Sequence, residues 1–186
     1  MNTIAEKTEK PTSKKKLIKL DIGCGQNKRD GFVGMDMVKL PGVDIVQDAE
    51  KTPWPIRDES VEEACISHYA EHVKNLPAFM DELHRVLVPE GRATIVCPYY
   101  TSMRSMQDPF HIRPISEATF LYYNADWRKA NGLDHYPIKC DFDFSYGYIF
   151  YPEWAMRSED ARAFAIRHYN NVASDIQVVL TKKIKK

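Results

Sequence analysis

Two short apolar runs, each ended by residues suited to a binding turn, constrain this chain more than any other feature. Residues 17–22 read Leu-Ile-Lys-Leu-Asp-Ile and lead into Gly23-Cys-Gly25, and residues 32–36 read Phe-Val-Gly-Met-Asp. Apolar runs of this length, bounded by glycines, are typical of buried parallel strands. In a doubly wound sheet, ligands bind at the carboxyl ends of such strands. The sequence therefore predicts a ligand site where these two runs end.

The acid that closes the second run, Asp36, suits a nucleoside ligand. Its carboxylate can accept hydrogen bonds from both ribose hydroxyls, and such charge-assisted bonds contribute about 1.5 to 3 kcal/mol. Gly23 and Gly25 have no Cβ, so the backbone can turn there and approach a ligand closely. We therefore expect Asp36 to hold the sugar beside a glycine turn.

A dinucleotide site is the main alternative, but it requires Gly-x-Gly-x-x-Gly opening a helix whose N-terminus receives the pyrophosphate. In this chain Lys28 occupies the place of the third glycine. Asp21 would repel a pyrophosphate, whereas it would attract the ammonium group of a methionine moiety. The charge pattern therefore favours S-adenosyl-L-methionine, a nucleoside with a positively charged sulfur, as the cofactor.

These segments resemble the class I, Rossmann-like methyltransferases, in particular a bacterial and phage group of small methyltransferase domains. That group reads Asp-x-Gly-Cys-Gly, a short loop, and then Gly-x-x-x-x-Asp. Three later segments match the group in order, namely Val46–Ala49, Ile66–His72 and Arg85–Gly91. The likeness covers about residues 17–100. The chain departs from the pattern at Asn27, where many members have a third glycine, and in a first helix shortened to about residues 26–30.

The resemblance implies an α/β fold with a Rossmann-like, seven-stranded and mostly parallel sheet. It further implies an antiparallel C-terminal edge strand, helices on both faces of the sheet and an insertion after the fifth strand. The residues expected to bind S-adenosylmethionine follow the strand ends: Asp21, Gly23, Cys24, Gly25, Asp36, Met37, Asp48, Ala49, Ser67 and His68. Among them, Asp48 is expected to accept a hydrogen bond from the adenine amino group, with a plain turn aspartate as the alternative.

The periodicity of the remaining chain supports alternating strands and helices. Strands are predicted at 43–47, 61–67, 92–97, 146–151 and 176–181, and helices at 77–87, 117–123 and from Ser158 through Ile166. Pro89-Glu-Gly91 predicts a turn before the fifth strand. Regular alternation stops at Pro98, so we assign residues 101–145 to an insertion that builds the acceptor pocket.

The segment Asp108-Pro-Phe-His-Ile-Arg-Pro114 is the candidate for catalysis, because it places an acid, an imidazole and a guanidinium between two prolines. Methyl transfer to a hydroxyl or a protonated amine requires a general base, and histidine titrates near neutrality. His111, Asp108 and Arg113 are therefore the predicted catalytic residues. The alternative is a purely structural loop, in which His111 bonds backbone carbonyls and Arg113 pairs with Asp108.

No metal site is predicted. His135, Cys140, Asp141 and Asp143 are metal-ligand types, but they show neither zinc-site spacing nor the helical His-Glu-x-x-His order. Four cysteines, Cys24, Cys65, Cys97 and Cys140, form no Cys-x-x-Cys pair and are interpreted as reduced core thiols. With no signal peptide or membrane span in the sequence, a cytoplasmic location is expected.

The 186 residues suffice for one domain, assigned to 17–186, after a lysine-rich tail at 1–16 that is expected to be disordered. Lys plus Arg and Asp plus Glu both number 26, so no global field attracts nucleic acid. The leading hypothesis is methyl transfer to a hydroxyl or nitrogen of a small-molecule, sugar or nucleotide-like acceptor. The alternatives are an RNA or DNA methyltransferase guided by lysine-rich termini, and a non-catalytic S-adenosylmethionine-binding partner subunit. The oligomeric state is not predicted.

Overall fold

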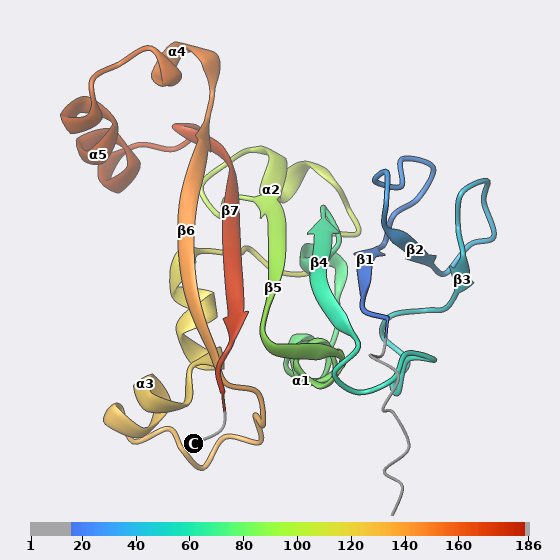
Figure 1. The fold of residues 1–186 in the computed structure, drawn as a ribbon. Coiled ribbons are helices and arrows are strands. Elements are labelled where there is room, and N and C mark those ends of the chain that lie inside the picture. Colours follow the sequence, from blue (N-terminus) through green and yellow to red (C-terminus); the bar gives the residue numbers. More distant parts are fainter. Residues whose placement is uncertain (1–15, 185–186) are drawn as a thin grey trace, which may run out of the picture.

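A seven-stranded sheet organises the computed structural model, which describes residues 16–184 (Figure 1). Its order is β3-β2-β1-β4-β5-β7-β6. The strands are β1 (Ile18–Ile22), β2 (Val33–Asp36), β3 (Ile45–Val46), β4 (Val61–Ser67), β5 (Leu87–Pro98), β6 (Phe142–Phe150) and β7 (Ala173–Lys182). The predicted fold class is confirmed. The predicted tail lies outside the described residues except for Lys16.

The C-terminal strand β7 is antiparallel to both of its neighbours, β5 and β6. The first five strands are mutually parallel. β7 is therefore the expected antiparallel strand, but it lies second from the edge, and β6 forms the edge itself. The chain forms β6 at the edge and leaves the position next to β5 open. It then turns back, and β7 fills that position between β5 and β6.

One helix covers the centre of the sheet. This helix, α1 (Leu76–Val86), begins where the Asn75 side chain accepts a hydrogen bond from the Ala78 amide, with Pro77 in its first turn. Its apolar side chains recur at helical spacing and are buried against the strands, Phe79, Met80, Leu83 and Val86 being at most 1% exposed. The predicted helix 77–87 is confirmed with its start shifted by one residue.

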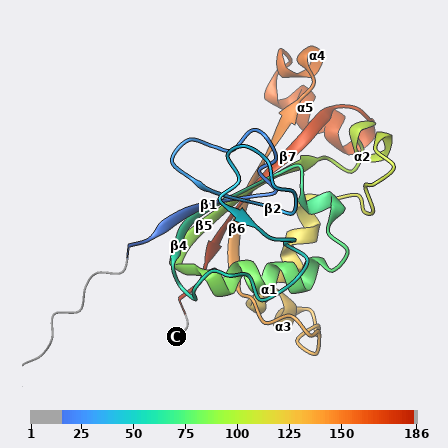
Figure 2. The same cartoon turned by 90° about the vertical axis from the view of Figure 1, so that its right-hand side faces the viewer.

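The helices that pack along the sheet lie on one face of it. Figure 1 shows α1 and η2 (Glu117–Tyr123, yellow) behind the strands and α3 (Ala125–Ala130) beyond the lower end of β6, and Figure 2 shows α1 on the same side of the sheet. On the other face the side chains of Lys19 and Glu63 form an ion pair, each more than 40% exposed. A shallow hollow of about 460 Å³ lies there between Lys19, Glu62, Glu63, Arg92, Thr94 and Val179. In residues 16–184, the expectation of helices on both faces therefore holds for one face only.

The connections from β1 to β4 explain the bare face, because none of them forms a helix. The short helix expected at residues 26–30 is absent. Side chains hold this loop instead: the Asp21 carboxylate accepts from the Arg29 amide at 2.8 Å, and the Lys28 ammonium donates to Asp44 at 2.9 Å. These contacts satisfy the loop without a helical turn.

The predicted turn at Pro89-Glu-Gly91 is part of β5 rather than a break before it. The pairing register between β4 and β5 shifts there, from Val61 opposite Leu87 to Glu63 opposite Arg92. Glu90 takes a left-handed backbone conformation with φ of 63°. The turn signal was therefore real, but the extra residues form a bulge within one continuous strand.

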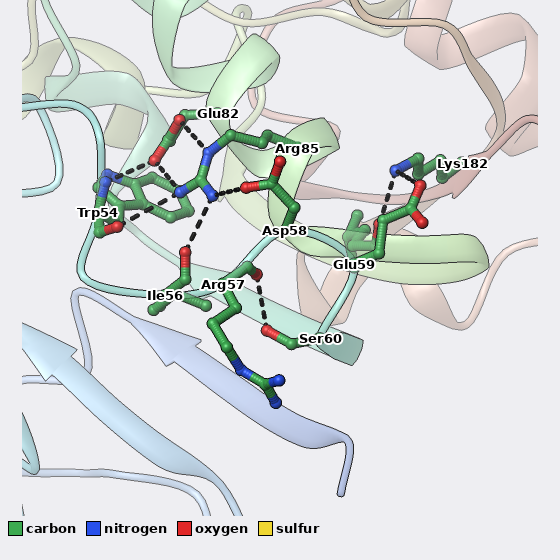
Figure 3. A network of polar contacts seen from close by, with 10 residues as sticks. Trp54, Ile56, Arg57, Asp58, Glu59, Ser60, Glu82, Arg85 and Lys182 are labelled. Carbon is green, nitrogen blue, oxygen red and sulfur yellow. Dashed lines mark hydrogen bonds and ion pairs between the residues drawn. The ribbon is translucent and has the colours of Figure 1, made fainter. Parts of the chain in front are cut away.

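A network of charged side chains ties the β3–β4 connection to α1 (Figure 3). Glu82 is 7% exposed and accepts hydrogen bonds from the Trp54 amide and from the Arg85 guanidinium. Arg85 also donates to the Ile56 carbonyl and contacts Asp58. Each donor and acceptor of this half-buried cluster is thereby matched to a partner, which fixes residues 54–58 against the helix.

Four further helices lie within residues 16–184. They are η1 (Ala70–His72) and α2 (Arg104–Gln107), which follow β4 and β5, and α5 (Glu159–His168), which with α4 (Pro152–Ala155) lies beyond the ends of β6 and β7 (Figure 1). Ser158 caps α5 by accepting from the Ala161 amide, as its place in the sequence predicts. Within residues 16–184, no helix has the length and apolar character needed to cross a bilayer. The four cysteines are free and buried, as expected.

Candidate functional site

The register of the parallel strands brings the predicted cofactor residues to one edge of the sheet. Ile22 of β1 pairs with Met35 of β2 and with Ile66 of β4, so the residues that follow these positions are neighbours. Asp36 in turn pairs with Val46 of β3. The four strand ends that carry the predicted residues therefore meet at the carboxyl edge, where ligands of such sheets bind.

The two glycines of the β1 turn have different environments. Both have positive φ, 67° at Gly23 and 52° at Gly25. A Cβ on Gly23 would lie 2.6 Å from Cδ2 of Tyr69, so this position is closed by an aromatic ring. A Cβ on Gly25 would meet nothing within 4 Å. Gly25 therefore faces open space, which leaves room for a ligand beside the turn.

Asp36 lies beside that open space. Its Oδ2 atom accepts a hydrogen bond from the Gly25 amide at 2.9 Å, and Oδ1 accepts one from the Val38 amide at 2.9 Å. A carboxylate has about four acceptor positions, so two remain for a ligand. The side chain is held in place by the backbone before any ligand arrives.

Asp21 and Lys28 stabilise the loop that follows the glycine turn. Asp21 is 4% exposed and binds the Arg29 amide, so the structure places it under the loop. Lys28 packs over Gly34, where a Cβ would lie 2.6 Å from its Cδ atom, and reaches Asp44. Lys28, which occupies the place of a third glycine, therefore binds the β2–β3 loop through Asp44. Cys24 is buried against the same glycine, its Sγ lying 2.9 Å from that Cβ position.

Asp48 and Ala49 follow β3 and lie near Tyr69. The Oδ1 atom of Asp48 accepts a hydrogen bond from the Glu50 amide at 3.0 Å, and Oδ2 lies 3.7 Å from the Lys51 ammonium. The first contact is that of a turn aspartate, the alternative role considered for this residue. Ala49 is 3% exposed, and its carbonyl accepts from the Trp54 indole. Burial, with smaller contributions from Asp48 and Glu50, raises the pKa of Tyr69 to about 12.

The remaining predicted residues, Met37, Ser67 and His68, are exposed at the same edge. Met37 is 63% exposed just beyond Asp36. His68 has a left-handed φ of 52°, and its amide continues the β4–β5 ladder by donating to the Val96 carbonyl. Ser67 therefore ends β4 and His68 turns away from it, with both residues exposed above the strand end.

The predicted catalytic segment is bound to the turn after β4. The Ile112 amide donates to the Glu71 carbonyl at 3.1 Å, and one guanidinium nitrogen of Arg113 donates to the carbonyls of Val73 and Lys74. His72 Nδ1 lies 3.2 Å from the Phe110 carbonyl. These contacts join segments almost forty residues apart and fix the loop over η1.

His111 is thereby directed at Glu71. Its Nδ1 contacts the Ser105 carbonyl at 3.1 Å, and its Nε2 lies 3.9 Å from Glu71 Oε1 and 3.8 Å from Asp108 Oδ2. The His111 and His72 rings meet edge to face, with centroids 4.7 Å apart. The structure therefore brings Asp108 and His111 together, while the contacts of Arg113 are with backbone carbonyls of the β4–α1 connection.

A second carboxylate, Asp175, enters the site from β7. It is 4% exposed and accepts hydrogen bonds from Ser174 at 2.7 Å and Arg104 at 3.1 Å through Oδ2. Its Oδ1 lies 4.0 Å from His68 Nε2. The contact of His68 with Glu71, whose Oε1 is 3.5 Å from Nδ1, raises the pKa of His68 above its ordinary value, although partial burial opposes this.

Sequence reasoning missed Glu71, His72 and Asp175. The first two belong to a matched segment, 66–72, in which only Ser67 and His68 received a role. An acid next to a histidine directly after a buried strand was a usable signal for them. For Asp175 the signal was a charged residue directly before the predicted strand 176–181.

Part of this chain matches a known protein family. Residues 27–95 match the family model described as "Methyltransferase domain", which is rather more than a third of the chain. No curated protein matches the chain significantly.

Several solved structures share the fold at low sequence identity. An S-adenosylmethionine-dependent methyltransferase from Archaeoglobus fulgidus is 18% identical with a TM-score of 0.62, over 90% of this chain and 87% of the other. One from Thermotoga maritima, described as a possible histamine N-methyltransferase, is 17% identical with a TM-score of 0.56, over 89% and 82%. The [4+2]-cyclase SpnF is 15% identical with a TM-score of 0.54, over 92% and 77%. At these identities the likeness establishes the fold, and the reaction must be argued from the site.

Proposed function

We propose that this chain, a class I, Rossmann-like methyltransferase with S-adenosylmethionine as its cofactor, methylates a hydroxyl or nitrogen of a small-molecule, sugar or nucleotide-like acceptor. The observation that carries the proposal is the pairing of Asp36 with the open Gly25 turn, directly beside a polar cluster above β4 and β5. The first feature suits the cofactor and the second suits an acceptor.

The residues at the strand ends fit the cofactor. Asp36, held by two backbone amides, offers its remaining acceptor positions to the ribose hydroxyls, and Gly25 leaves the space beside it open. Met37 and Asp48 would lie on the adenine side, and Gly23, Ser67 and His68 on the methionine side. Asp21 and Cys24 would act from beneath, by holding the loop that frames the ligand. When bound, S-adenosylmethionine supplies a methyl carbon activated by positively charged sulfur.

The acceptor side is proposed to consist of the cluster above β4. In-line transfer requires alignment of the nucleophile and exclusion of water more than a particular catalytic group. His111 and Asp108 would contact the acceptor, because both face the interior of the cluster. Arg113 would act as a positioning residue, because its two bonds to carbonyls hold the loop that presents His111.

An imidazole at this place can take a proton from the acceptor. A carbonyl can only accept hydrogen bonds, so the contact with Ser105 requires the proton of neutral His111 to be on Nδ1. Its Nε2 then carries a lone pair that faces the cluster. Loss of the acceptor proton to such a group is general base catalysis.

Transfer of radiolabelled methyl groups from S-adenosylmethionine tests the proposal. The protein is incubated with fractionated cell extract, separated into metabolites below a few kilodaltons, nucleic acid and protein. Label in the metabolite fraction, absent with Asp36→Ala, is the expected result. Label in RNA or DNA would favour the nucleic-acid alternative, and cofactor binding without label in any fraction would favour a non-catalytic partner subunit.

We expect the protein to work in a reducing compartment such as the cytoplasm. Its four cysteines are free and buried, and burial raises the pKa of Cys65 to about 11, so that the thiol stays protonated and unreactive.

A further inference from the structure

Glu71 is a buried carboxylate for which residues 16–184 provide no hydrogen bond. The residue is 2% exposed, yet neither Oε1 nor Oε2 accepts one. Two imidazole nitrogens lie within 4 Å of Oε1, His68 Nδ1 at 3.5 Å and His111 Nε2 at 3.9 Å, but neither makes a hydrogen bond with it. Buried charged groups are normally paired or bound to a metal. Glu71 therefore has imidazole groups within ion-pair distance but no hydrogen bond to offset its burial.

Two histidines present bare nitrogens next to this carboxylate. His111 Nδ1 contacts the Ser105 carbonyl at 3.1 Å, and His72 Nδ1 contacts the Phe110 carbonyl at 3.2 Å. Because carbonyls only accept, each neutral ring has its proton on Nδ1 and its lone pair on Nε2. Histidines that bind metals almost always donate their other ring nitrogen in this way. The backbone thus fixes both rings in the tautomer of a metal ligand.

The three side chains converge although they come from separate parts of the chain. One ligand atom each of Glu71, His72 and His111 lies within 4.8 Å of the others. Glu71 and His72 are adjacent in η1, and His111 is brought to them by the loop that is bonded to η1 through Ile112 and Arg113. The loop contacts would therefore preserve the arrangement in the absence of an ion.

We propose that Glu71, His72 and His111 bind a divalent transition-metal ion at the acceptor side of the site. Two imidazoles and one carboxylate suit zinc, and also iron, cobalt or manganese, better than magnesium or calcium, which prefer oxygen ligands. Three protein ligands leave positions open, which is typical of catalytic rather than structural sites. Asp108, whose Oδ2 is 3.8 Å from His111 Nε2, lies near enough to accept a hydrogen bond from a water bound to the ion.

The position of the ion defines the acceptor more narrowly, and this part of the inference rests on the proposed function. An ion between Glu71 and His111 would bind an oxygen of the acceptor and lower the pKa of its hydroxyl. The lone pair of His111 would then bind the metal, so the proton of the acceptor hydroxyl would pass to the neighbouring Asp108 carboxylate or to solvent instead. The geometry points to a hydroxyl acceptor, with the metal in place of a free imidazole base.

Metal binding is tested on the full chain after chelation and buffer exchange. Co²⁺ serves as the probe, because its visible absorption reports coordination directly, and Zn²⁺ and Mg²⁺ are titrated in competition. One Co²⁺ per chain is expected, displaced by Zn²⁺ and not by Mg²⁺. His72→Ala and Glu71→Gln are expected to weaken binding at least about 100-fold. His135→Ala, a histidine exposed on the α3–β6 connection, is the matched control and is expected to bind as the unmodified protein does.

The outcomes separate this inference from the proposed function, because S-adenosylhomocysteine binding is measured on each protein alongside circular dichroism. The metal site alone would be overturned if the nucleoside bound as expected but no Co²⁺ spectrum appeared. Equal Co²⁺ affinity in His72→Ala and His135→Ala, again with unchanged nucleoside binding, would have the same meaning. Co²⁺ binding without nucleoside binding would overturn the proposed function and leave the metal site standing.

Discussion

The Asp36 carboxylate and the Gly25 amide are joined by a hydrogen bond of 2.9 Å, which links the end of β2 to the turn after β1. The contact orients the carboxylate toward the space that Gly25 leaves open. The group that we propose to bind the ribose is thereby fixed in advance by the backbone, so little conformational entropy would be lost on ligand binding.

Replacing single glycines with alanine should reduce the stability of the protein by different amounts. Gly23, Gly25 and Gly132 all have positive φ, so each substitution should cost about 1 to 2 kcal/mol of stability. Gly23→Ala should cost about 1 to 3 kcal/mol more, because its Cβ would clash with Tyr69. Urea denaturation measures these differences.

Cofactor affinity separates the other two glycines. Gly132 and Gly25 both face open space, but only Gly25 adjoins Asp36. Gly25→Ala should weaken S-adenosylhomocysteine binding, and Gly132→Ala should not. Equal affinities in these two variants would show that the turn does not border the ligand.

The Asp44 contacts predict an acid-sensitive contribution to stability. Hydrogen bonds from the Lys28 ammonium and the Gly34 amide lower the pKa of Asp44 below its ordinary 3.8. A lowered folded-state pKa contributes stability above the unfolded value and loses it as pH falls through the folded value. Asp44→Asn should therefore lower the melting temperature at pH 7, and the difference should vanish in strong acid. A difference that stays constant with pH would refute this role.

His111→Ala should lower turnover far more than cofactor affinity. The ring lies near Glu71 and Asp108 and contacts none of the residues proposed to bind the ribose, so its loss should reduce kcat by at least about 100-fold. The Kd for S-adenosylhomocysteine should change little. His168→Ala, on the exposed end of α5, is the control. Unaltered turnover in His111→Ala would remove this residue from the reaction.

Glu82→Gln should destabilise the fold by about 2 to 4 kcal/mol, because Arg85 would lose the buried one of its two carboxylate partners and keep only the exposed Asp58. Glu63→Gln, in the exposed pair with Lys19, should change stability by less than about 1 kcal/mol. Guanidinium denaturation of both variants measures the contrast. Similar losses in the two would mean that the network in Figure 3 is not buried enough to matter.

The strand ends were predictable because local signals determine them. Apolar runs ended by Gly23 and Asp36 specify buried strands, and their parallel register follows from the fold. The helix α1 was equally clear, since Asn75, Pro77 and the apolar period agree. Local propensity and tertiary packing coincide in these elements.

The acceptor side was less predictable because it depends on contacts between distant residues. The sequence identified His111 and Asp108, but Glu71 and Asp175 enter the cluster only when the loop bonds to η1 and β7 pairs with β5. The bare sheet face was missed for a related reason. Side-chain contacts of Asp21 and Lys28 replace a helix that the resemblance implied.

Isothermal titration of S-adenosylhomocysteine into the full chain and into Asp36→Ala tests the central claim most directly. We predict one site per chain, weakened at least about 10-fold by the substitution, since charge-assisted bonds to the ribose contribute about 1.5 to 3 kcal/mol each. Asp30→Ala, an exposed acid in the neighbouring loop, should leave the affinity unchanged. Absence of binding to the folded protein at millimolar ligand, or equal affinity in the two variants, would contradict the account.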